Sequence, residues 1–297
     1  MDMLRITGLK KQFKDRSIID GLDLAVPEHC ILGFIGENGA GKTTTMKMVL
    51  GLLKPDAGEI YVNNEKVIYG QTKTNQYIGY LPDVPEFYDF MTPTEYLTFC
   101  GEITGLEKTE IKERIDELLK LVGLNDETHR IKGFSRGMKQ RLGIAQALLG
   151  KPKLLICDEP TSALDPIGRK EILDILKQVS KETTVIFSTH VLSDVERICT
   201  DVALLHHGVI CMQKDILSIK SSNRKQEYRL ELEDGVEDLM QAFDGMERID
   251  DHNLRFCERN GELYTVLAWI VEKKVPLIKI EKLEPSLENL FMEVVQA

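Results

Sequence analysis

Short apolar segments and helix-type patterns alternate along the first two thirds of the chain. Residues 30–35, 154–157 and 184–188 are almost continuously apolar over a length typical of strands buried on both faces. Residues 111–122 and 142–149 instead place apolar side chains on one side of a helix. This alternation of strands and helices predicts a layered α/β fold.

Two further patterns belong to the same region. Residues 60–62 and 66–68, around Asn63-Asn64, predict a hairpin beside the core. Thr92-Pro93-Thr94-Glu95 is a capping box with proline at the first helical position, so a helical insertion begins there. We expect a first domain over residues 1–215, with a helical subdomain at about 84–150.

The last third of the chain has a different organisation. Residues 216–225 are mainly polar and predict a linker. Residues 226–297 then predict a small accessory domain of strand, helix, two strands, helix and strand, an order that indicates a ferredoxin-like α+β fold. These elements are expected at residues 228–232, 236–243, 248–249, 254–257, 263–271 and 277–281.

Composition narrows the class of protein. The 297 residues are 42% hydrophobic and 29% charged, and no apolar run approaches the ~20 residues that span a bilayer. Arg5, Lys10 and Lys11 interrupt any apolar core of a signal peptide. The six cysteines show neither CxxC nor Cys/His spacing, so we expect reduced core thiols in a cytoplasmic protein.

The charge distribution argues against nucleic acid as a partner. The net charge is −10, and residues 222–297 contribute −7 from 17 acidic and 10 basic residues. An acidic surface repels phosphate backbones and anionic lipids.

The most informative motif is Gly36-Glu37-Asn38-Gly39-Ala40-Gly41-Lys42-Thr43, which fits the phosphate-binding pattern G-x-x-x-x-G-K-[ST]. Glycines let the backbone aim its N–H groups at phosphate oxygens. Lys42 would then reach the β- and γ-phosphates and Thr43 would bind Mg²⁺. The apolar run before the motif and the helix that continues through Thr44 agree with a phosphate at a helix N-terminus. A glycine-rich turn without a ligand is the alternative.

Two acidic residues end the apolar run at 154–157. Asp158 is placed to bind Mg²⁺ through water, and Glu159, which points elsewhere, can polarise the water that attacks the γ-phosphate. The alternative is an ordinary strand end with solvated carboxylates.

A helix start lies between these two motifs. In Phe134-Ser135-Arg136-Gly137-Met138-Lys139-Gln140, Ser135 occupies an N-cap position and Gly137 allows a phosphate to approach. A capped helix alone is commonplace, and the motif gains meaning from its order relative to the others.

Over roughly residues 3–215, the chain resembles the ATP-binding subunit of ABC transporters. Phe13 resembles the aromatic residue that stacks on adenine, and Gly36–Thr43 and Leu154–Glu159 resemble the Walker A and Walker B motifs. Residues 77–83 resemble the approach to the Q-loop and 134–140 the signature. The D-loop is matched by 162–165 and the switch histidine by His190.

The resemblance implies a P-loop ABC-type ATPase that uses ATP and Mg²⁺. It assigns catalytic roles to Glu159, His190 and Asp83, and metal binding to Thr43, Asp83 and Asp158. The implied nucleotide-binding residues are Phe13, Gly36, Asn38, Gly39, Ala40, Gly41, Lys42, Thr43, Thr44, Ser135 and Gly137.

The resemblance also implies an assembly. Two ATP-binding subunits, identical or paralogous, would close head to tail, so that each ATP lies between the Walker motifs of one chain and Ser135 and Gly137 of the other. A separate transmembrane permease subunit would hold the chain at the inner face of the membrane. The alternative is a soluble ABC ATPase of DNA repair or translation without a membrane partner.

Three positions depart from the general family pattern. Asp83 replaces the usual Gln, Phe13 replaces the commoner Tyr, and the signature reads Phe-Ser-Arg-Gly-Met. The first and third departures resemble the ABC-2 type subfamily, most of whose members drive export of drugs, antimicrobial peptides, lipids, polysaccharides or sodium. A closing helix at 285–292 also resembles that subfamily.

Residues 83–105 are expected to form the surface that meets the permease. Phe87, Tyr88 and Phe90 lie in this segment. Packing of these rings in the core is the alternative interpretation.

Overall fold

The computed structural model describes residues 2–14, 16–222, 226–258, 262–283 and 287–288. These residues form two compact units, one extending to Ile216 and the other beginning at Leu217. Each unit contains its own buried apolar cluster.

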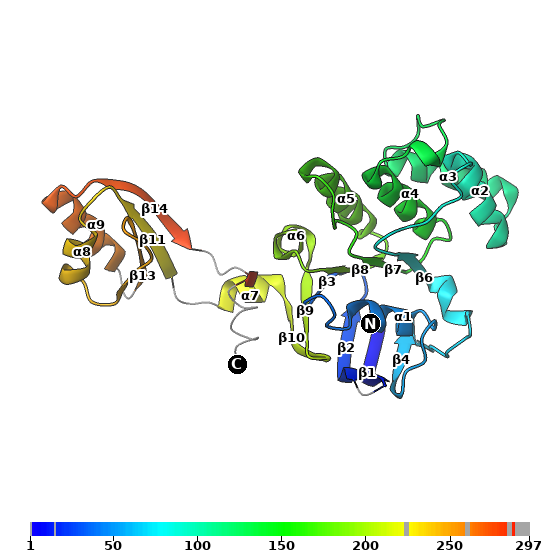
Figure 1. Cartoon of the computed structure of the whole chain (residues 1–297), viewed down its shortest axis with the longest axis horizontal. Helices are drawn as coiled ribbons and strands as arrows, with labels where there is room; N and C mark the ends of the chain where they lie inside the picture. The colour runs from blue at the N-terminus through cyan, green and yellow to red at the C-terminus, as the bar shows by residue number, and fades with distance from the viewer. Residues whose placement is uncertain (1, 15, 223–225, 259–261, 284–286, 289–297) are drawn as a thin grey trace. The chain divides into compact units, whose positions relative to one another are not determined.

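A six-stranded sheet with the order β10-β9-β3-β8-β7-β6 forms the centre of the first unit (Figure 1). The strands from β9 to β6 are parallel, and β10 pairs with β9 in the antiparallel direction. Their bounds are β3 Ile31–Ile35, β6 Ile78–Leu81, β7 Leu154–Asp158, β8 Thr184–Thr189, β9 Asp201–His206 and β10 Val209–Asp215. Every residue of β3, β7 and β8 is buried, as both faces of a parallel sheet are covered. Parallel strands end at one edge, so the residues that follow β3, β7 and β8 meet there.

A second, antiparallel sheet with the order β2-β1-β4-β5 shares its core with the first. Its strands are β1 Asp2–Phe13, β2 Arg16–Pro27, β4 Ala57–Val62 and β5 Glu65–Lys66. The expected hairpin forms as β4 and β5, with Tyr61 opposite Lys66, but its second strand ends before Val67.

Helices complete the first unit, and α2, α3 and α4 gather into one region (Figure 1). The helical elements are α1 Lys42–Val49, η1 Lys73–Tyr77, α2 Pro93–Ile103, α3 Lys108–Leu121, η2 Ile131–Gly133, α4 Arg136–Leu148, α5 Pro166–Val179 and α6 Leu192–Ile198. The capping box is confirmed: Thr92 Oγ1 accepts from the Glu95 N–H, and Glu95 Oε2 accepts from the Thr92 N–H at 2.8 Å.

The second unit has the strand order β12-β13-β11-β14, which is that of a ferredoxin-like fold. Its elements are β11 Gln226–Leu232, α8 Val236–Ala242, β12 Met246–Arg248, β13 Asn253–Glu258, α9 Glu262–Lys273 and β14 Leu277–Leu283. Leu230, Leu254 and Phe256 of the sheet form the core with residues of α8 and α9, including Leu239 and Val266.

The linker prediction over 216–225 is wrong in its first part. Residues Ile216–Ser222 form helix α7, and Ile216 and Ile219 are buried. Of the closing helix expected at 285–292, only Leu287 and Glu288 lie in the described residues, and both are helical.

The aromatic residues after β6 do not all enter the core. Tyr88 and Phe90 are 50% and 63% exposed, whereas Phe87 is half-buried against Tyr96. The core interpretation therefore fails for Tyr88 and Phe90.

The cysteines are free thiols. No disulfide joins any of the six, and burial raises the pKa of the Cys30 thiol to about 12. At neutral pH this thiol stays protonated and packs as a small apolar side chain.

Helix α4 lies directly against β6 because Gly79 has no side chain. A Cβ at Gly79 would lie 2.2 Å from the carbonyl oxygen of Ala147, near the end of α4. This contact fixes the helix whose first turn carries Ser135 and Gly137.

Gly79→Ala should therefore destabilise the first unit by roughly 1–3 kcal/mol, because the added methyl must push α4 away from β6. Differential scanning calorimetry should show a lower transition temperature. Gly150→Ala is the matched control, since no atom lies within 4 Å of its added Cβ, and should unfold like the wild type. An unshifted transition in Gly79→Ala would contradict the close approach.

Candidate active site

The loop between β3 and α1 is shaped by its glycines. Gly39 and Gly41 have φ angles of +84° and +111°, in the region that favours glycine. A Cβ at Gly36 would lie 2.6 Å from the Leu205 carbonyl oxygen. Helix α1 begins directly after this loop without a side-chain cap, so its first N–H groups are open to an anion.

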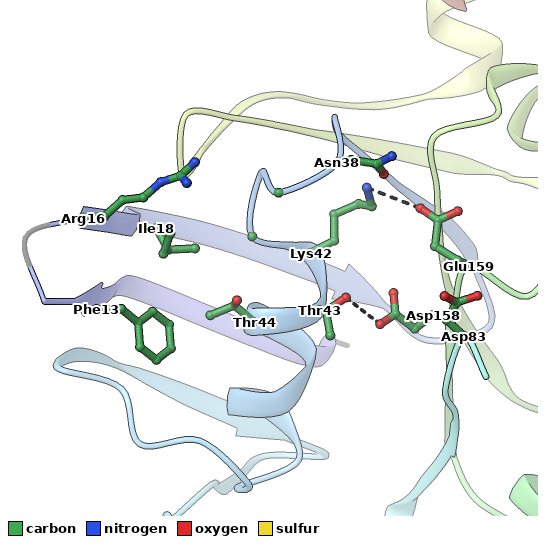
Figure 2. Close-up of a pocket in the computed structure, with 12 residues that line it drawn as sticks. Phe13, Arg16, Ile18, Asn38, Lys42, Thr43, Thr44, Asp83, Asp158 and Glu159 are labelled. Atoms are coloured by element: carbon green, nitrogen blue, oxygen red, sulfur yellow. Dashed lines mark hydrogen bonds and ion pairs between the residues drawn. The ribbon is translucent and has the colours of Figure 1, made fainter. Parts of the chain in front are cut away.

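Lys42 is buried at the start of α1. Its ammonium donates to the carbonyl oxygens of Gly36 and Glu37 at 2.6 and 3.3 Å and lies 3.4 Å from Glu159 Oε1. The loop therefore holds a positive charge at its centre (Figure 2).

Asp158 is a buried carboxylate with two hydroxyl donors. Thr43 Oγ1 donates to its Oδ2 at 2.7 Å, and Ser188 Oγ donates to its Oδ1 at 2.6 Å. The two bonds satisfy a charge that is only 3% exposed. Sequence reasoning missed Ser188, and the one available signal was a hydroxyl within a buried strand.

Glu159 lies between Lys42 and His190. Its Oε2 is 2.9 Å from His190 Nδ1, while its buried Oε1 accepts no hydrogen bond from the described residues. The backbone of Glu159 has a φ of +48°, and its N–H donates to Ser188. A non-glycine residue in this region is strained, and such strain gathers at functional sites.

A cavity of about 500 Å³ is lined by Lys42, Asp158 and Glu159, whereas His190 is not among its lining residues. Figure 2 shows Phe13 and Arg16 on one side and Asp158, Glu159 and Asp83 on the other. Most of the predicted site residues line it: Phe13, Asn38, Gly39, Gly41, Lys42, Thr43, Thr44, Asp83, Asp158 and Glu159. Arg16 and Ile18 also line it and were not predicted.

Ser135 and Gly137 are not among the residues that line this cavity. Ser135 caps α4, with its Oγ accepting from the Met138 N–H at 3.2 Å, and it is exposed. A Cβ on Gly137 would meet nothing closer than 4.0 Å, so the backbone there is open to approach. The first turn of α4 thus presents an uncovered, capped N-terminus.

Asp83 connects three segments. Its Oδ1 accepts from Ser162 Oγ at 2.7 Å and lies 3.5 Å from Arg136 Nη2, while its carbonyl oxygen accepts from Gln140. The Ser162 N–H donates to the Glu159 carbonyl oxygen, closing a turn. Asp83 therefore holds the turn that follows Glu159.

Tyr80 of β6 lies near the carboxylates of Asp158 and Asp83. Burial raises the pKa of Tyr80 to about 12, and the charges of Asp158 and Asp83 add to the shift. In the described ranges, no three or more His, Cys, Asp or Glu side chains are grouped to hold a metal ion by themselves.

Residues 19–162 match the profile of the ABC transporter family. The uncharacterised ABC transporter ATP-binding protein YxlF of Bacillus subtilis is 38% identical over 99% of this chain and 100% of its own length. The chain belongs to the ABC transporter family.

Its relatives within this family include resistance and transport proteins. The bacitracin transport ATP-binding protein BcrA of Bacillus licheniformis is 38% identical over 99% of this chain and 97% of its own. The linearmycin resistance ATP-binding protein LnrL of Bacillus subtilis is 31% identical over 98% of both chains. This ABC protein is an ATP-binding subunit and an ATPase. Its transport and resistance relatives favour the transporter interpretation over repair or translation.

Solved structures confirm the fold of the ABC domain. An ATP-binding subunit of an ABC transporter is 29% identical, with a TM-score of 0.67 over 74% of this chain and 92% of its own. CbiO1 from Clostridium perfringens, part of the transporter complex CbiONQ, has the same identity and TM-score. No helix in the described part of this ABC subunit is long and apolar enough to cross a membrane.

The contacts of Asp83 predict coupling to Ser162. Asp83→Ala and Ser162→Ala should each lower the maximal ATPase rate severalfold with ATP affinity within a few-fold, because each releases the turn after Glu159. The double variant should hydrolyse ATP no more slowly than the slower single variant, because both substitutions remove the same hydrogen bond. Asp89→Ala removes a nearby carboxylate that pairs with Lys139 at the surface, and should hydrolyse ATP like the wild type. Independent, additive losses would contradict the shared contact.

Proposed function

We propose that this chain powers export through a separate transmembrane permease, as one of two ATP-binding subunits that close head to tail on ATP. The observation that carries the proposal is a division of the predicted site. Lys42, Asp158 and Glu159 meet at one cavity, whereas Ser135 and Gly137 stay outside it with an open approach.

The cavity suits a nucleoside triphosphate. The uncapped start of α1 and the ammonium of Lys42 face the position of the phosphates, and Phe13, which is 47% exposed, offers a ring on which adenine can stack. Lys42 must exchange its carbonyl partners for phosphate oxygens, which are stronger acceptors.

Thr43 and Asp158 fit a magnesium ion. Both offer oxygen atoms, the ligands that Mg²⁺ prefers, and their side chains already meet at 2.7 Å. Phosphate oxygens and water would complete the shell. When bound, the ion neutralises phosphate charge.

Glu159 and His190 are positioned to act on the attacking water. Oε1 of Glu159 is buried and accepts no hydrogen bond from the described residues, so it can accept one from a water molecule. Oxygen attack on the γ-phosphorus breaks the bond to the β-phosphate, and the water proton passes to Glu159. His190 Nδ1 lies 2.9 Å from the other carboxylate oxygen, Oε2, and orients the Glu159 carboxylate.

The two-chain arrangement completes the site. Ser135 and Gly137 at the uncovered start of α4 would approach the γ-phosphate bound by the other chain. Each copy then contributes its Walker half to one site and its signature half to the other, so a twofold axis relates the two copies. A paralogue with the same halves could replace the second copy.

The segment 83–105 is the proposed permease surface. Val84, Tyr88, Phe90 and Ile103 are each at least 50% exposed, and Tyr88 contacts the rings of Phe90 and Phe99. Exposed apolar groups gathered in one segment mark interaction sites. Export is the proposed direction because bacitracin transport and linearmycin resistance proteins are relatives, and contact with a permease would place the chain at the inner face of the membrane.

Glu159→Gln should bind ATP but hydrolyse it at least ~100-fold more slowly, because the amide keeps the shape and loses the base. Rapid-quench measurement of phosphate release gives the rate, and fluorescent-nucleotide titration gives the affinity. Lys42→Ala should instead weaken ATP binding, since a charge at the phosphates is lost. Near-normal turnover of Glu159→Gln would remove Glu159 from its role.

Ser135→Arg should leave ATP binding by the monomer intact and abolish the ATP-driven dimer. The Arg side chain would block the approach of α4 to the other chain's nucleotide. Light scattering in the Glu159→Gln background measures the dimer, because slow hydrolysis prolongs it. Glu113→Arg, on the exposed side of α3, is the control and should dimerise. A dimer of unchanged affinity in Ser135→Arg would reject the composite site.

A further inference from the structure

Strand β14 forms one edge of the sheet in the second unit, next to β11 (Figure 1). Within the described residues, its other side pairs with no strand. All five residues from Ile278 to Lys282 are exposed, including Ile278 at 60% and Ile280 at 37%. Backbone groups along such an edge can pair with an added strand.

The register with β11 separates the two faces of β14. Ile280 lies opposite Leu230, a fully buried core residue, so Ile280 belongs to the face that the helices cover. Lys279 lies opposite Glu231 and Glu281 opposite Arg229, on the other face. The outer face thus places opposite charges across the two strands, while Lys279 Nζ lies 2.8 Å from Glu281 Oε2 within β14 itself.

The sequence of β14 is complementary to itself when reversed. It reads Leu277-Ile278-Lys279-Ile280-Glu281-Lys282-Leu283. In an antiparallel pair centred on Ile280, Lys279 of each copy lies opposite Glu281 of the other. Ile280 lies opposite itself, and the irregularity at Ile278 in the pairing with β11 confines the regular part of β14 to Lys279–Leu283.

The charges also continue across the new junction. A line of four residues then crosses the joined sheets: Arg229 and Glu281 of one copy, followed by Lys279 and Glu231 of the second copy. The sign of the charge alternates from each residue to the next. By twofold symmetry a second line shows the same alternation. We propose that β14 pairs antiparallel with β14 of a second copy, joining two four-stranded sheets into one.

The same charges select the register. A slip of two residues in one direction places Lys279 opposite Lys279, and a slip in the other direction places Glu281 opposite Glu281. Like charges directly opposite destabilise a strand pair. Of these registers, only the one centred on Ile280 places Lys279 and Glu281 of each copy opposite a residue of opposite charge.

The contact does not require nucleotide. It involves only the second unit, and the residues at the ATP cavity take no part. If the head-to-tail closure of the proposed function also occurs, this contact would raise the effective concentration of one ATP-binding unit near the other. That consequence rests on the proposed function, whereas the β14 contact itself does not.

Sedimentation velocity of the full chain in EDTA without nucleotide tests the pairing over a range of protein concentrations. The wild type should show a concentration-dependent monomer–dimer equilibrium. Lys279→Glu and Glu281→Lys should each weaken the dimer at least about tenfold, equivalent to about 1.4 kcal/mol, because each creates two like-charge pairs. The double charge swap should restore the dimer to within about threefold.

Mixing the two single variants gives the sharpest result. One chain then carries glutamate at positions 279 and 281, and the other carries lysine at both. The mixture should therefore form heterodimers, although each variant alone dimerises more weakly than the wild type. Thermal unfolding curves check that each variant still folds cooperatively, because each charge change also places a like charge opposite Arg229 or Glu231 of β11 in the same chain. A monomeric wild type, unaffected single variants, or failure of both the double swap and the mixture to recover would overturn the pairing. ATP-driven closure is followed separately by light scattering of Glu159→Gln that also carries Lys279→Glu, in which the β14 contact is weakened, so failure of the β14 pairing is distinguished from failure of the proposed function.

Discussion

The structure of the site depends on the need to satisfy one buried carboxylate. Asp158 ends strand β7 with almost no access to water, and an unpaired charge there would be strongly unfavourable. Hydroxyl donors from α1 and β8, Thr43 and Ser188, satisfy it from two sides. The same contacts tie the phosphate-binding loop, β7 and β8 to a common geometry, so the charge that must be compensated also organises the cavity.

Glu159 shows how adjacent acids acquire different environments. Asp158 has both carboxylate oxygens bonded to hydroxyls, whereas Glu159 turns away through a left-handed backbone and reaches Lys42 and His190. One residue therefore separates a carboxylate with hydrogen bonds to both oxygens from one whose Oε1 accepts no hydrogen bond from the described residues. Because Ser188 contacts Asp158 and the Glu159 backbone, it positions both.

The sequence predicted the parts of this site that are local in the chain. Glycine spacing defined the loop before α1, and apolar runs located the strands whose ends carry Asp158 and His190. It did not predict the Ser188 and Asp83 contacts, because these depend on the strand order and on how the turn after Glu159 meets β6. The linker error has a local cause: the polar stretch near 216–225 contains Ile216 and Ile219, whose spacing of three suits a single helical turn. In the second unit, the predicted order of strands and helices was sufficient to predict the ferredoxin-like topology.

The exclusion of Ser135 and Gly137 from their own chain's cavity has a genetic consequence under the head-to-tail arrangement. A lesion at Glu159 and a lesion at Ser135 on different chains would fall in the same composite site of a mixed dimer. The other site would then receive an intact Walker half and an intact signature half. Two defective alleles could therefore complement each other, whereas two lesions on one chain, paired with a normal chain, would impair both sites.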